Sequence, residues 1–248
     1  MSDATSAARV LAILQMFERE KRPLSLKELS EYCQIPASTC HSLVHTLMKC
    51  SYLYQTGRRK DLYPTRRIFD IGAIIVANDP FLQRMEPVME ALRDRTQETI
   101  ILGKRQKDNI VYLVVLEGPQ TIRYSAAVGD MKPLHSTCIG KTMLAAMKPN
   151  DLRVWLEQQS LEEVTGNTIV SYARLIEHLQ EAEEVGYFTT RGENVQDVTA
   201  ISVPISINDE LLGLAVAGPS IRMDERFDEM VSLLKQSQSE LIAGGIAL

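Results

Sequence analysis

Residues 25–50, SLKELSEYCQIPASTCHSLVHTLMKC, decide how the first part of this chain folds, because they have the pattern of two short helices joined by a tight turn. Ser25 and Glu28 have the spacing of a capping box, in which each side chain accepts a hydrogen bond from the backbone N–H of the other residue. Residues 33–35 are expected to form the turn. Pro36 suits the first position of the second helix, where its missing N–H has no cost.

The second helix of this pair has two different faces. The apolar residues expected to face inward are Cys40, Leu43, Val44 and Leu47. The outward face has small and hydrogen-bonding side chains and no acid, which suits a helix lying in the major groove of DNA. The residues assigned to DNA contact are Ser38, Thr39, His41, Ser42, His45 and Thr46. On this stretch alone, two amphipathic helices packed in an ordinary core would be the better interpretation.

A basic hairpin follows the helix pair and favours the DNA-binding interpretation. Two strand-like runs, residues 51–56 and 61–63, flank a tip at residues 57–60. The cations of this tip, placed to meet phosphates, are Arg58, Arg59 and Lys60. The sequence therefore predicts a winged helix-turn-helix domain over residues 1–64.

The net charge of −5 is distributed unevenly along the 248 residues. Residues 1–79 hold 11 Lys and Arg against 8 Asp and Glu, a net charge of +3. From chain totals of 27 and 32, the remainder holds 16 and 24, a net charge of −8. We therefore expect only the first part to contact nucleic acid. The positive surplus is small for one copy, which favours a dimer on two half-sites.

The sequence gives no indication of a membrane or of export. No apolar run approaches the ~20 residues needed to cross a bilayer. Residues 1–10 lack a charged-then-apolar signal pattern, and the four cysteines show no close pairing. We expect reduced thiols, a cytoplasmic location and no membrane partner.

A further helix is expected at residues 66–78. Its apolar residues are Ile68, Phe69, Ile71, Ile74, Ile75 and Val76, more than one face against a small domain requires. We interpret residues 65–79 as a linker helix that pairs with a second subunit, the alternative being an ordinary buried helix. Asp79-Pro80 ends this helix and predicts the domain boundary.

Residues 80–248 combine strands with helices. The expected strands are residues 99–105, 110–116, 122–128, 187–191, 198–207 and 211–217, with residues 208–210 turning the last two. The expected helices are residues 86–97, 137–147, 151–159, 172–185 and 224–242. Strands at both ends with helices between them predict an α+β sensor-like domain, a mixed sheet flanked by helices.

Three local patterns occur in this second part. They are PLHSTCIGKTMLA at residues 133–145, Gly192-Glu193 followed by residues 198–205, and Gly218-Pro219 with Arg222. Together and in this order they resemble the IclR family of bacterial transcription regulators, and the resemblance covers nearly the whole chain. It implies an operator-binding N-terminal part, a GAF-like mixed α/β effector-binding part, and homodimers or dimers of dimers. Such a regulator represses or activates a catabolic operon in response to a small organic acid.

The turn into the helix at residues 137–147 has the features of an anion site. There the N–H groups of Cys138, Ile139 and Gly140 lack intrahelical partners and lie at the positive end of the helix dipole. The alternative is that Ser136 or Thr137 caps the helix and nothing binds.

The resemblance also assigns the effector-binding positions. They are Thr121 at the entrance, Cys138, Ile139, Gly140, Thr190, Ala200, Ala215 and Ala217. At the last four of these positions some relatives have polar groups, whereas here the side chains are small and largely apolar. We therefore expect an apolar ligand body, such as that of an aromatic carboxylate, rather than a very small hydroxy- or keto-acid. No cofactor is implied.

The recognition helix departs from the family pattern as well. Many relatives carry Arg at the position of Ser42, and here the outward face has no Arg. Base reading is expected to fall to the polar side chains of that face. Much of the affinity is expected to come from the cations of the hairpin tip, with Arg66 and Arg67 as further candidates.

Other chemistries fit the residues less well. Gly140-Lys141-Thr142 ends like a P-loop, but His135 stands where that loop needs glycine. His41 and His45 have the spacing of helical zinc ligands without a third ligand, so we expect no metal. A thiol such as Cys138 at a helix N-terminus is a candidate redox sensor.

The sequence predicts a regulator rather than an enzyme. An enzyme acting on a small carboxylic acid and fused to a DNA-binding domain is the alternative. A ligand-free architectural DNA-binding protein is the third interpretation.

Overall fold

The computed structural model describes residues 5–57, 60–207 and 210–243 of the chain. The chain divides into two compact units, Met1–Gln83 and Arg84–Leu248, and each has its own hydrophobic core. The division falls inside helix α5 (Pro80–Thr96), whereas the sequence predicts a break at Asp79-Pro80.

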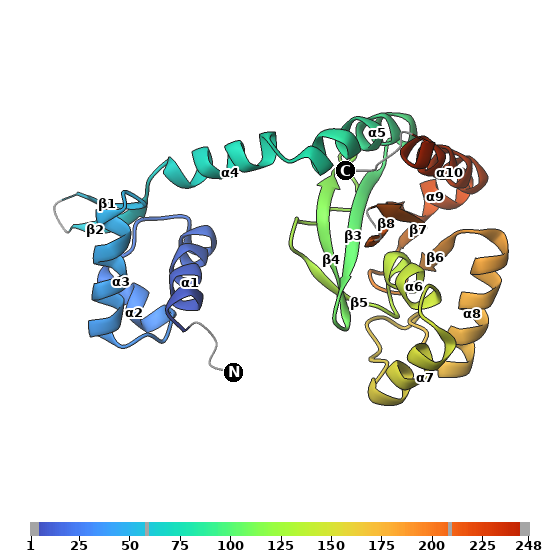
Figure 1. The fold of residues 1–248 in the computed structure, drawn as a ribbon, viewed down its shortest axis with the longest axis horizontal. Coiled ribbons are helices and arrows are strands. Elements are labelled where there is room, and N and C mark those ends of the chain that lie inside the picture. Colours follow the sequence, from blue (N-terminus) through green and yellow to red (C-terminus); the bar gives the residue numbers. More distant parts are fainter. Residues whose placement is uncertain (1–4, 58–59, 208–209, 244–248) are drawn as a thin grey trace. The chain divides into compact units, whose positions relative to one another are not determined.

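The first unit is a helix-turn-helix followed by a two-stranded hairpin (Figure 1). Its elements are α1 (Thr5–Glu20), α2 (Leu26–Tyr32), α3 (Ala37–Lys49), β1 (Leu53–Thr56), β2 (Asp61–Pro64) and α4 (Arg67–Ala77). The two strands pair antiparallel, and Leu24 bridges to Leu62 beside them. Ile13, Phe17 and Val44 belong to the core beneath the helices. The predicted winged helix-turn-helix fold is confirmed.

The capping box predicted at the start of α2 is present. The Ser25 N–H donates to Glu28 Oε2 at 2.8 Å, and Ser25 Oγ accepts the Glu28 N–H at 3.2 Å. The pKa of Glu28 falls to about 2, chiefly through the hydrogen bond from the Ser25 backbone. Pro36 lies one position earlier than expected, as the N-cap of α3.

Helix α4 is apolar and uncovered by the described part of the chain. None of its residues is buried. Phe69, Ile74 and Ile75 are 66%, 63% and 65% exposed. The alternative of an ordinary helix buried within its own chain is therefore wrong.

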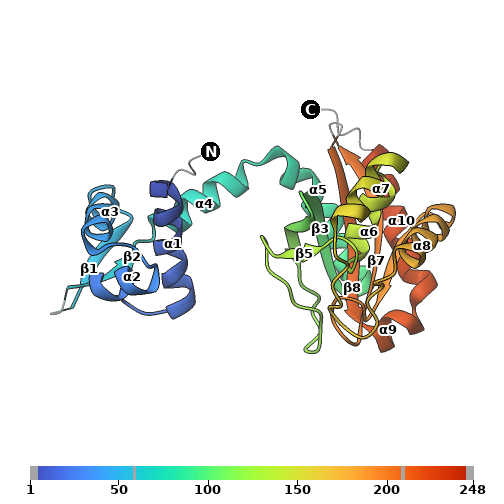
Figure 2. The ribbon, with the colours of Figure 1, turned by 90° about the horizontal axis from the view of Figure 1, so that it is seen from below.

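The second unit is a six-stranded sheet with helices on both faces. Its strands are β3 (Thr99–Gln106), β4 (Asn109–Leu116), β5 (Met131–Pro133), β6 (Phe188–Arg191), β7 (Val198–Ile207) and β8 (Glu210–Pro219). Beyond α5, its helices are α6 (Cys138–Ala145), α7 (Pro149–Gln158), α8 (Tyr172–Val185), α9 (Ser220–Glu225) and α10 (Phe227–Ala243). Figures 1 and 2 show α6 and α8 on one face of the sheet and α9 and α10 on the other.

The strand order is β5-β4-β3-β8-β7-β6, and each of the pairings between these strands is antiparallel. The α+β class is confirmed, but the expected mixed sheet was wrong. The crossover from β5 through α6 and α8 to β6 delivers β6 to the far edge of the sheet.

The strand predicted at residues 122–128 was also wrong. Residues 117–130 contain neither helix nor strand, and the short strand β5 comes after them. The closing helix predicted at residues 224–242 is two helices, α9 and α10. The turn expected at residues 208–210 lies partly outside the described residues, because Asn208 and Asp209 are not among them.

Candidate functional site

The outward face of α3 has the composition expected for contact with a polar partner. Five of the predicted DNA-contacting residues are exposed, namely Ser38, His41, Ser42, His45 and Thr46, while Thr39 is half-buried. The buried residues of the helix are Cys40, Val44 and Leu47, as the spacing indicates. The Thr46 hydroxyl donates to the Ser42 carbonyl at 3.0 Å, which leaves its lone pairs free to accept.

The cations near this helix are in different situations. Lys60 is exposed at the hairpin turn, and Arg58 and Arg59 lie outside the described residues. The Arg66 guanidinium pairs with Asp70 at 3.2 Å. The Arg67 guanidinium lies over the Tyr52 ring, 5.3 Å from its centroid. Arg66 and Arg67 thus contact groups of their own unit.

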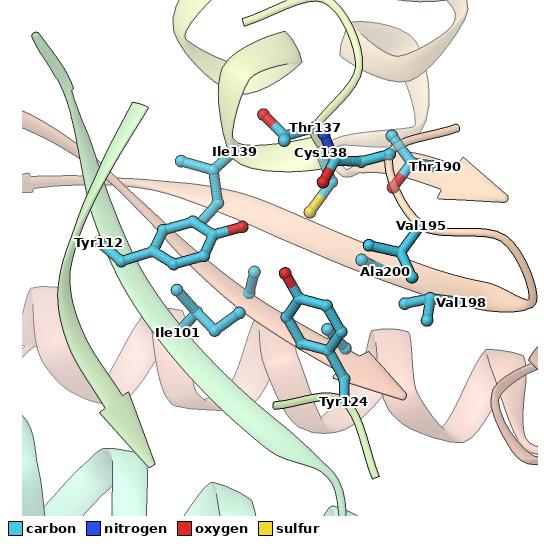
Figure 3. A pocket seen from close by; sticks show the side chains of 13 residues that line it. Ile101, Tyr112, Tyr124, Thr137, Cys138, Ile139, Thr190, Val195, Val198 and Ala200 are labelled. Atoms are coloured by element: carbon cyan, nitrogen blue, oxygen red, sulfur yellow. The ribbon is translucent and has the colours of Figure 1, made fainter. Parts of the chain in front are cut away.

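A cavity in the second unit lies between the sheet and the N-terminus of α6 (Figure 3). Six of the eight predicted effector positions line it, namely Cys138, Ile139, Thr190, Ala200, Ala215 and Ala217. The sequence did not indicate the other lining residues as pocket positions, which are Ile101, Tyr112, Tyr124, Thr137, Asn194, Val195 and Val198. None of these described lining residues carries a charge.

Two predicted positions do not line the cavity. Thr121 is exposed in the irregular segment before β5. Gly140 is buried against the backbone of Leu134, where an added Cβ would lie only 2.0 Å from the carbonyl oxygen. Its N–H donates to Thr137 Oγ1 at 3.1 Å, so the structure provides the cap that the sequence left as an alternative.

The first turn of α6 still presents donors to the cavity. Because Thr137 occupies the N–H of Gly140, the N–H groups of Cys138 and Ile139 are the ones at the cavity that lack intrahelical acceptors. They lie at the positive end of the helix dipole, which favours a carboxylate or another small anion. The surrounding wall is apolar on the sheet side, with Ile101, Ala215 and Ala217.

Two tyrosine rings take up most of the room inside the cavity. Figure 3 shows the hydroxyl groups of Tyr112 and Tyr124 directed toward each other beneath Cys138. The free space that remains is about 30 Å³, whereas ligand pockets usually measure ~300–1,000 Å³. Burial is the main cause that raises the pKa of both phenols, and the proximity of Tyr124 adds to the shift of Tyr112. Both phenols therefore stay protonated at neutral pH and can donate hydrogen bonds.

Burial also determines the pKa of the Cys138 thiol at the N-terminus of α6. Desolvation raises the pKa of Cys138 to about 11, against smaller lowering contributions from Ser202 and from the Ile139 N–H. A redox sensor needs a lowered thiol pKa and solvent access, so this environment is the opposite of a reactive one.

An ion pair behind the cavity connects its walls. Lys141 of α6 is fully buried and donates to both oxygens of Glu193, at 2.7 and 2.8 Å. Glu193 belongs to the loop that carries Asn194 and Val195, and Asn194 donates to Ser136 Oγ at 3.0 Å. Burial lowers the pKa of Lys141 and raises that of Glu193, because desolvation disfavours both charged forms.

The part of residues 117–130 that carries Tyr124 pairs with no strand, and side chains of other elements hold its backbone. The Thr99 hydroxyl donates to the Tyr124 carbonyl, and Arg222 Nη2 donates to the Ile122 carbonyl at 2.9 Å. The same guanidinium makes a bidentate pair with the buried Glu98, at 2.6 and 2.9 Å. Glu98 follows α5 directly, so this segment and the end of α5 share one arginine.

Within the described residues, no three His, Cys, Asp or Glu side chains converge as metal ligands. No helix in the same ranges is long and apolar enough to cross a membrane.

Family models match both units of the chain. The model of the IclR helix-turn-helix domain matches residues 6–57, and that of the bacterial transcriptional regulator IclR C-terminal domain matches residues 74–242. The chain belongs to the IclR family of bacterial transcriptional regulators. This membership confirms the predicted regulator class and disfavours the two alternatives, an enzyme and an architectural DNA-binding protein.

Three relatives match this IclR-family chain over nearly its whole length. The HTH-type transcriptional regulator KdgR of Escherichia coli K12 is 28% identical over 242 residues, which are 96% of this chain and 92% of KdgR. The crystal structure of Thermotoga maritima IclR superposes with a TM-score of 0.81 at 21% identity, covering 96% of this chain and 98% of that one. An IclR homologue from Microbacterium hydrocarbonoxydans, solved with 4-hydroxybenzoate, gives a TM-score of 0.77 at 21% identity, covering 95% and 97%.

Proposed function

We propose that this IclR-family regulator binds operator DNA through α3 and the β1–β2 hairpin, senses a small carboxylate in the α6 cavity, and thereby controls a catabolic operon. The observation that carries the proposal is the helix N-terminus of Cys138 and Ile139, which opens into an apolar cavity. Its N–H donors and dipole stabilise an anionic group where the lining side chains supply no cation.

On the DNA side, α3 acts as the recognition helix. Its exposed face offers hydroxyl and imidazole groups, which hydrogen-bond to base edges in the major groove. The three cations of the hairpin tip contact phosphates, and these contacts contribute affinity without sequence preference. Arg58 and Arg59 enter this proposal from the sequence alone.

On the effector side, the carboxylate of the ligand accepts the N–H groups of Cys138 and Ile139. The hydroxyl groups of Thr190 and Tyr112 supply further donors. Ala200, Ala215 and Ala217 provide a small apolar wall, which favours an aromatic over a short aliphatic acid. 4-Hydroxybenzoate, present in the structure of the Microbacterium relative, is a suitable first probe.

The regulator acts as a homodimer or a dimer of dimers, with residues 1–64 as DNA-binding domain, 65–79 as linker and 80–248 as effector domain. The exposed apolar side chains of α4 supply the pairing surface. A groove of about 490 Å³ lies beside α4, lined by Leu11, Phe17 and Ile68 among others. An effector changes operator affinity only if it binds one arrangement of the dimer better than the other.

The decisive experiment is selection of bound DNA from a random pool, followed by footprinting with a panel of aliphatic and aromatic carboxylic acids. We expect a pseudo-palindromic site whose affinity one aromatic acid changes. Enrichment without any acid response would remove the effector half of the proposal. No enrichment at all would contradict the DNA-binding half.

Two substitutions separate the roles on DNA. Arg59→Ala should weaken binding to specific and scrambled DNA alike, because a phosphate contact has no sequence preference. His41→Ala should change which sequence is preferred, because its imidazole reads bases. Gel-shift assays on both DNAs measure this, and equal losses for both variants on both DNAs would contradict the assignment.

A further inference from the structure

Two tyrosine side chains narrow the α6 cavity. Tyr112 and Tyr124 fill the space next to the helix N-terminus, and only about 30 Å³ remains. A water molecule needs ~10–15 Å³ on this measure, so no ring-sized ligand fits while both phenols are in place. One of the two tyrosines must therefore move for an effector to bind.

Tyr112 is the fixed member of the pair. It lies in β4, an inner strand between β3 and β5, and its partner in the ladder is Gly103 of β3. Its backbone also bonds Gly129 and Asp130, which lie next to β5 at the end of residues 117–130. Moving Tyr112 would break the sheet ladder, which costs many hydrogen bonds at once.

Tyr124 is the movable member. It lies in residues 117–130, which form no helix or strand, and its side chain is half-buried. The hydrogen bond described for its backbone is the one that its carbonyl accepts from the Thr99 hydroxyl. Displacing its ring requires a rearrangement within residues 117–128, whose backbone takes part in no strand pairing.

The segment of Tyr124 touches residues 97–99, which connect α5 to the start of β3, at three points. The Gly118 N–H donates to Thr99 Oγ1 at 3.2 Å. A Cβ on Gly118 would lie 2.9 Å from the Gln97 carbonyl oxygen, so the two backbones are in direct contact. Arg222 bridges the Ile122 carbonyl to the Glu98 carboxylate. A shift of Tyr124 therefore changes the contacts of the residues that follow α5.

Arg222 connects the segment of Tyr124 to Glu98 through its hydrogen bonds. Its guanidinium holds Glu98 with two parallel hydrogen bonds and gives a third to the Ile122 carbonyl. Glu98 is 1% exposed, and it fits beside β8 only because Gly218 has no side chain: a Cβ there would lie 2.3 Å from Oε2. Because Gly218 leaves Glu98 little room, a displacement of Arg222 acts on the Glu98 carboxylate directly.

We propose that Tyr124 is the specificity-determining residue of the effector site, whose ring the effector displaces, and that Arg222 is the positioning residue that passes this displacement to the end of α5. The proposal rests on the proposed function and deepens it. The expected effector has one planar ring and a carboxylate. Its ring takes the place of the Tyr124 ring, and its carboxylate binds the start of α6. Helix α5 follows α4 after Asn78 and Asp79, so the signal enters the linker along the chain.

The test needs no knowledge of the effector. Full-length protein carrying Tyr124→Ala mimics the displaced ring, so its affinity for the selected operator, with no acid added, should differ about tenfold from that of the wild type. In an Arg222→Gln background the same Tyr124→Ala change should alter operator affinity less than twofold, because the hydrogen bonds that connect Ile122 to Glu98 are lost. In an Arg191→Gln background the tenfold change should persist, since Arg191 pairs with the exposed Asp224 and does not touch Glu98.

The outcomes separate this proposal from the proposed function. Wild-type protein that binds no operator contradicts the proposed function. Operator binding that Tyr124→Ala leaves unchanged overturns the role of Tyr124. A tenfold effect that survives Arg222→Gln overturns the role of Arg222. If Arg222→Gln fails to fold, Arg222→Lys, which keeps the charge but loses the forked geometry, takes its place with the same expected suppression. Tyr124→Leu likewise replaces Tyr124→Ala.

Discussion

At the scale of single residues, Cys138 shows that burial outweighs position. A helix N-terminus lowers a thiol pKa, but here desolvation raises the pKa of Cys138 to about 11. At neutral pH only on the order of one such thiol in ten thousand is ionised.

Native protein treated with iodoacetamide at pH 7.5 should therefore be alkylated at the exposed Cys50 long before Cys138. The rate at Cys138 should rise with pH up to about 11. Peptide mass spectrometry over time measures both sites, with urea-unfolded protein as the control in which both react. Rapid alkylation of Cys138 in the folded state would restore the redox interpretation.

The Lys141–Glu193 pair gives a second prediction at this scale. Removing one member of a buried pair leaves an uncompensated charge, so Lys141→Met should cost about 3–5 kcal/mol. The double variant Lys141→Met with Glu193→Gln should cost less than either single change, because no buried charge remains. Urea unfolding followed by the fluorescence of Trp155, the single tryptophan, reports this unit.

Lys104→Met is the matched control for that prediction. Lys104 belongs to the same unit, and its pair with Glu210 is exposed, so its loss should cost about 0–1 kcal/mol. If the double variant has as low a free energy of unfolding as the less stable single variant, the ion pair stabilises the fold by more than it offsets the burial of its two charges.

At the scale of elements, the start of α2 depends on its capping box. Ser25→Ala should destabilise the first turn by about 1 kcal/mol. The pKa of Glu28 lies at about 2 in the folded chain, below its usual 4.5. Its contribution is therefore complete above pH 4.5 and is lost as the pH falls toward 2.

Hydrogen exchange of the α2 amides, corrected for the intrinsic rate, measures this loss. Protection should fall between pH 4.5 and 2.5 in the wild type and much less in Glu28→Gln, which has no carboxylate to protonate. Glu31→Gln, on the exposed side of the same helix, should behave as the wild type does.

The elements also show what the sequence could and could not predict. The capping box, the faces of α3 and the bounds of α8 follow from local patterns, and the structure contains them as expected. The strand predicted at residues 122–128 fails, although its alternation is real. Tyr124 and Ala126 pack on the core while their neighbours Arg123, Ser125 and Ala127 are exposed, but the backbone has no partner strand. Alternation reports which side chains are buried, not which backbones pair.

The cavity shows the same limit. Cys138 and Ile139 were predictable because their position at a helix start is a local property. Tyr112 and Tyr124 were not, since only the antiparallel packing of β4 beside β3 and the path of residues 117–130 bring their rings to that helix start. An aromatic residue in an apolar run carries no local signal that it faces a ligand.

At the scale of the whole molecule, α4 predicts association between copies. Wild-type protein should sediment as a dimer or larger, because its apolar side chains have no cover within the described chain. Ile74→Glu combined with Ile75→Glu should sediment as a single chain, since charges cannot be buried in an apolar interface.

Ile221→Glu is the control for this prediction. Ile221 is 84% exposed on the short helix α9, so a charge there should leave the assembly unchanged. Analytical ultracentrifugation measures all three proteins. A wild-type protein that stays monomeric at micromolar concentration would remove the pairing role of α4.

Two facing glycines set a boundary on how this sensor can change over evolution. Gly103 of β3 pairs with Gly213 of β8, and Ile139 of α6 sits in the hollow between them. A Cβ on Gly213 would lie 2.7 Å from the Ile139 side chain, so the anion-facing helix start is seated at the depth of the backbone. The position of this helix start relative to the sheet therefore depends on both glycines. New ligand preferences are therefore open to substitution in the side chains that line the rest of the cavity, such as Tyr124, Thr190 and Ala200, and not at these two glycines.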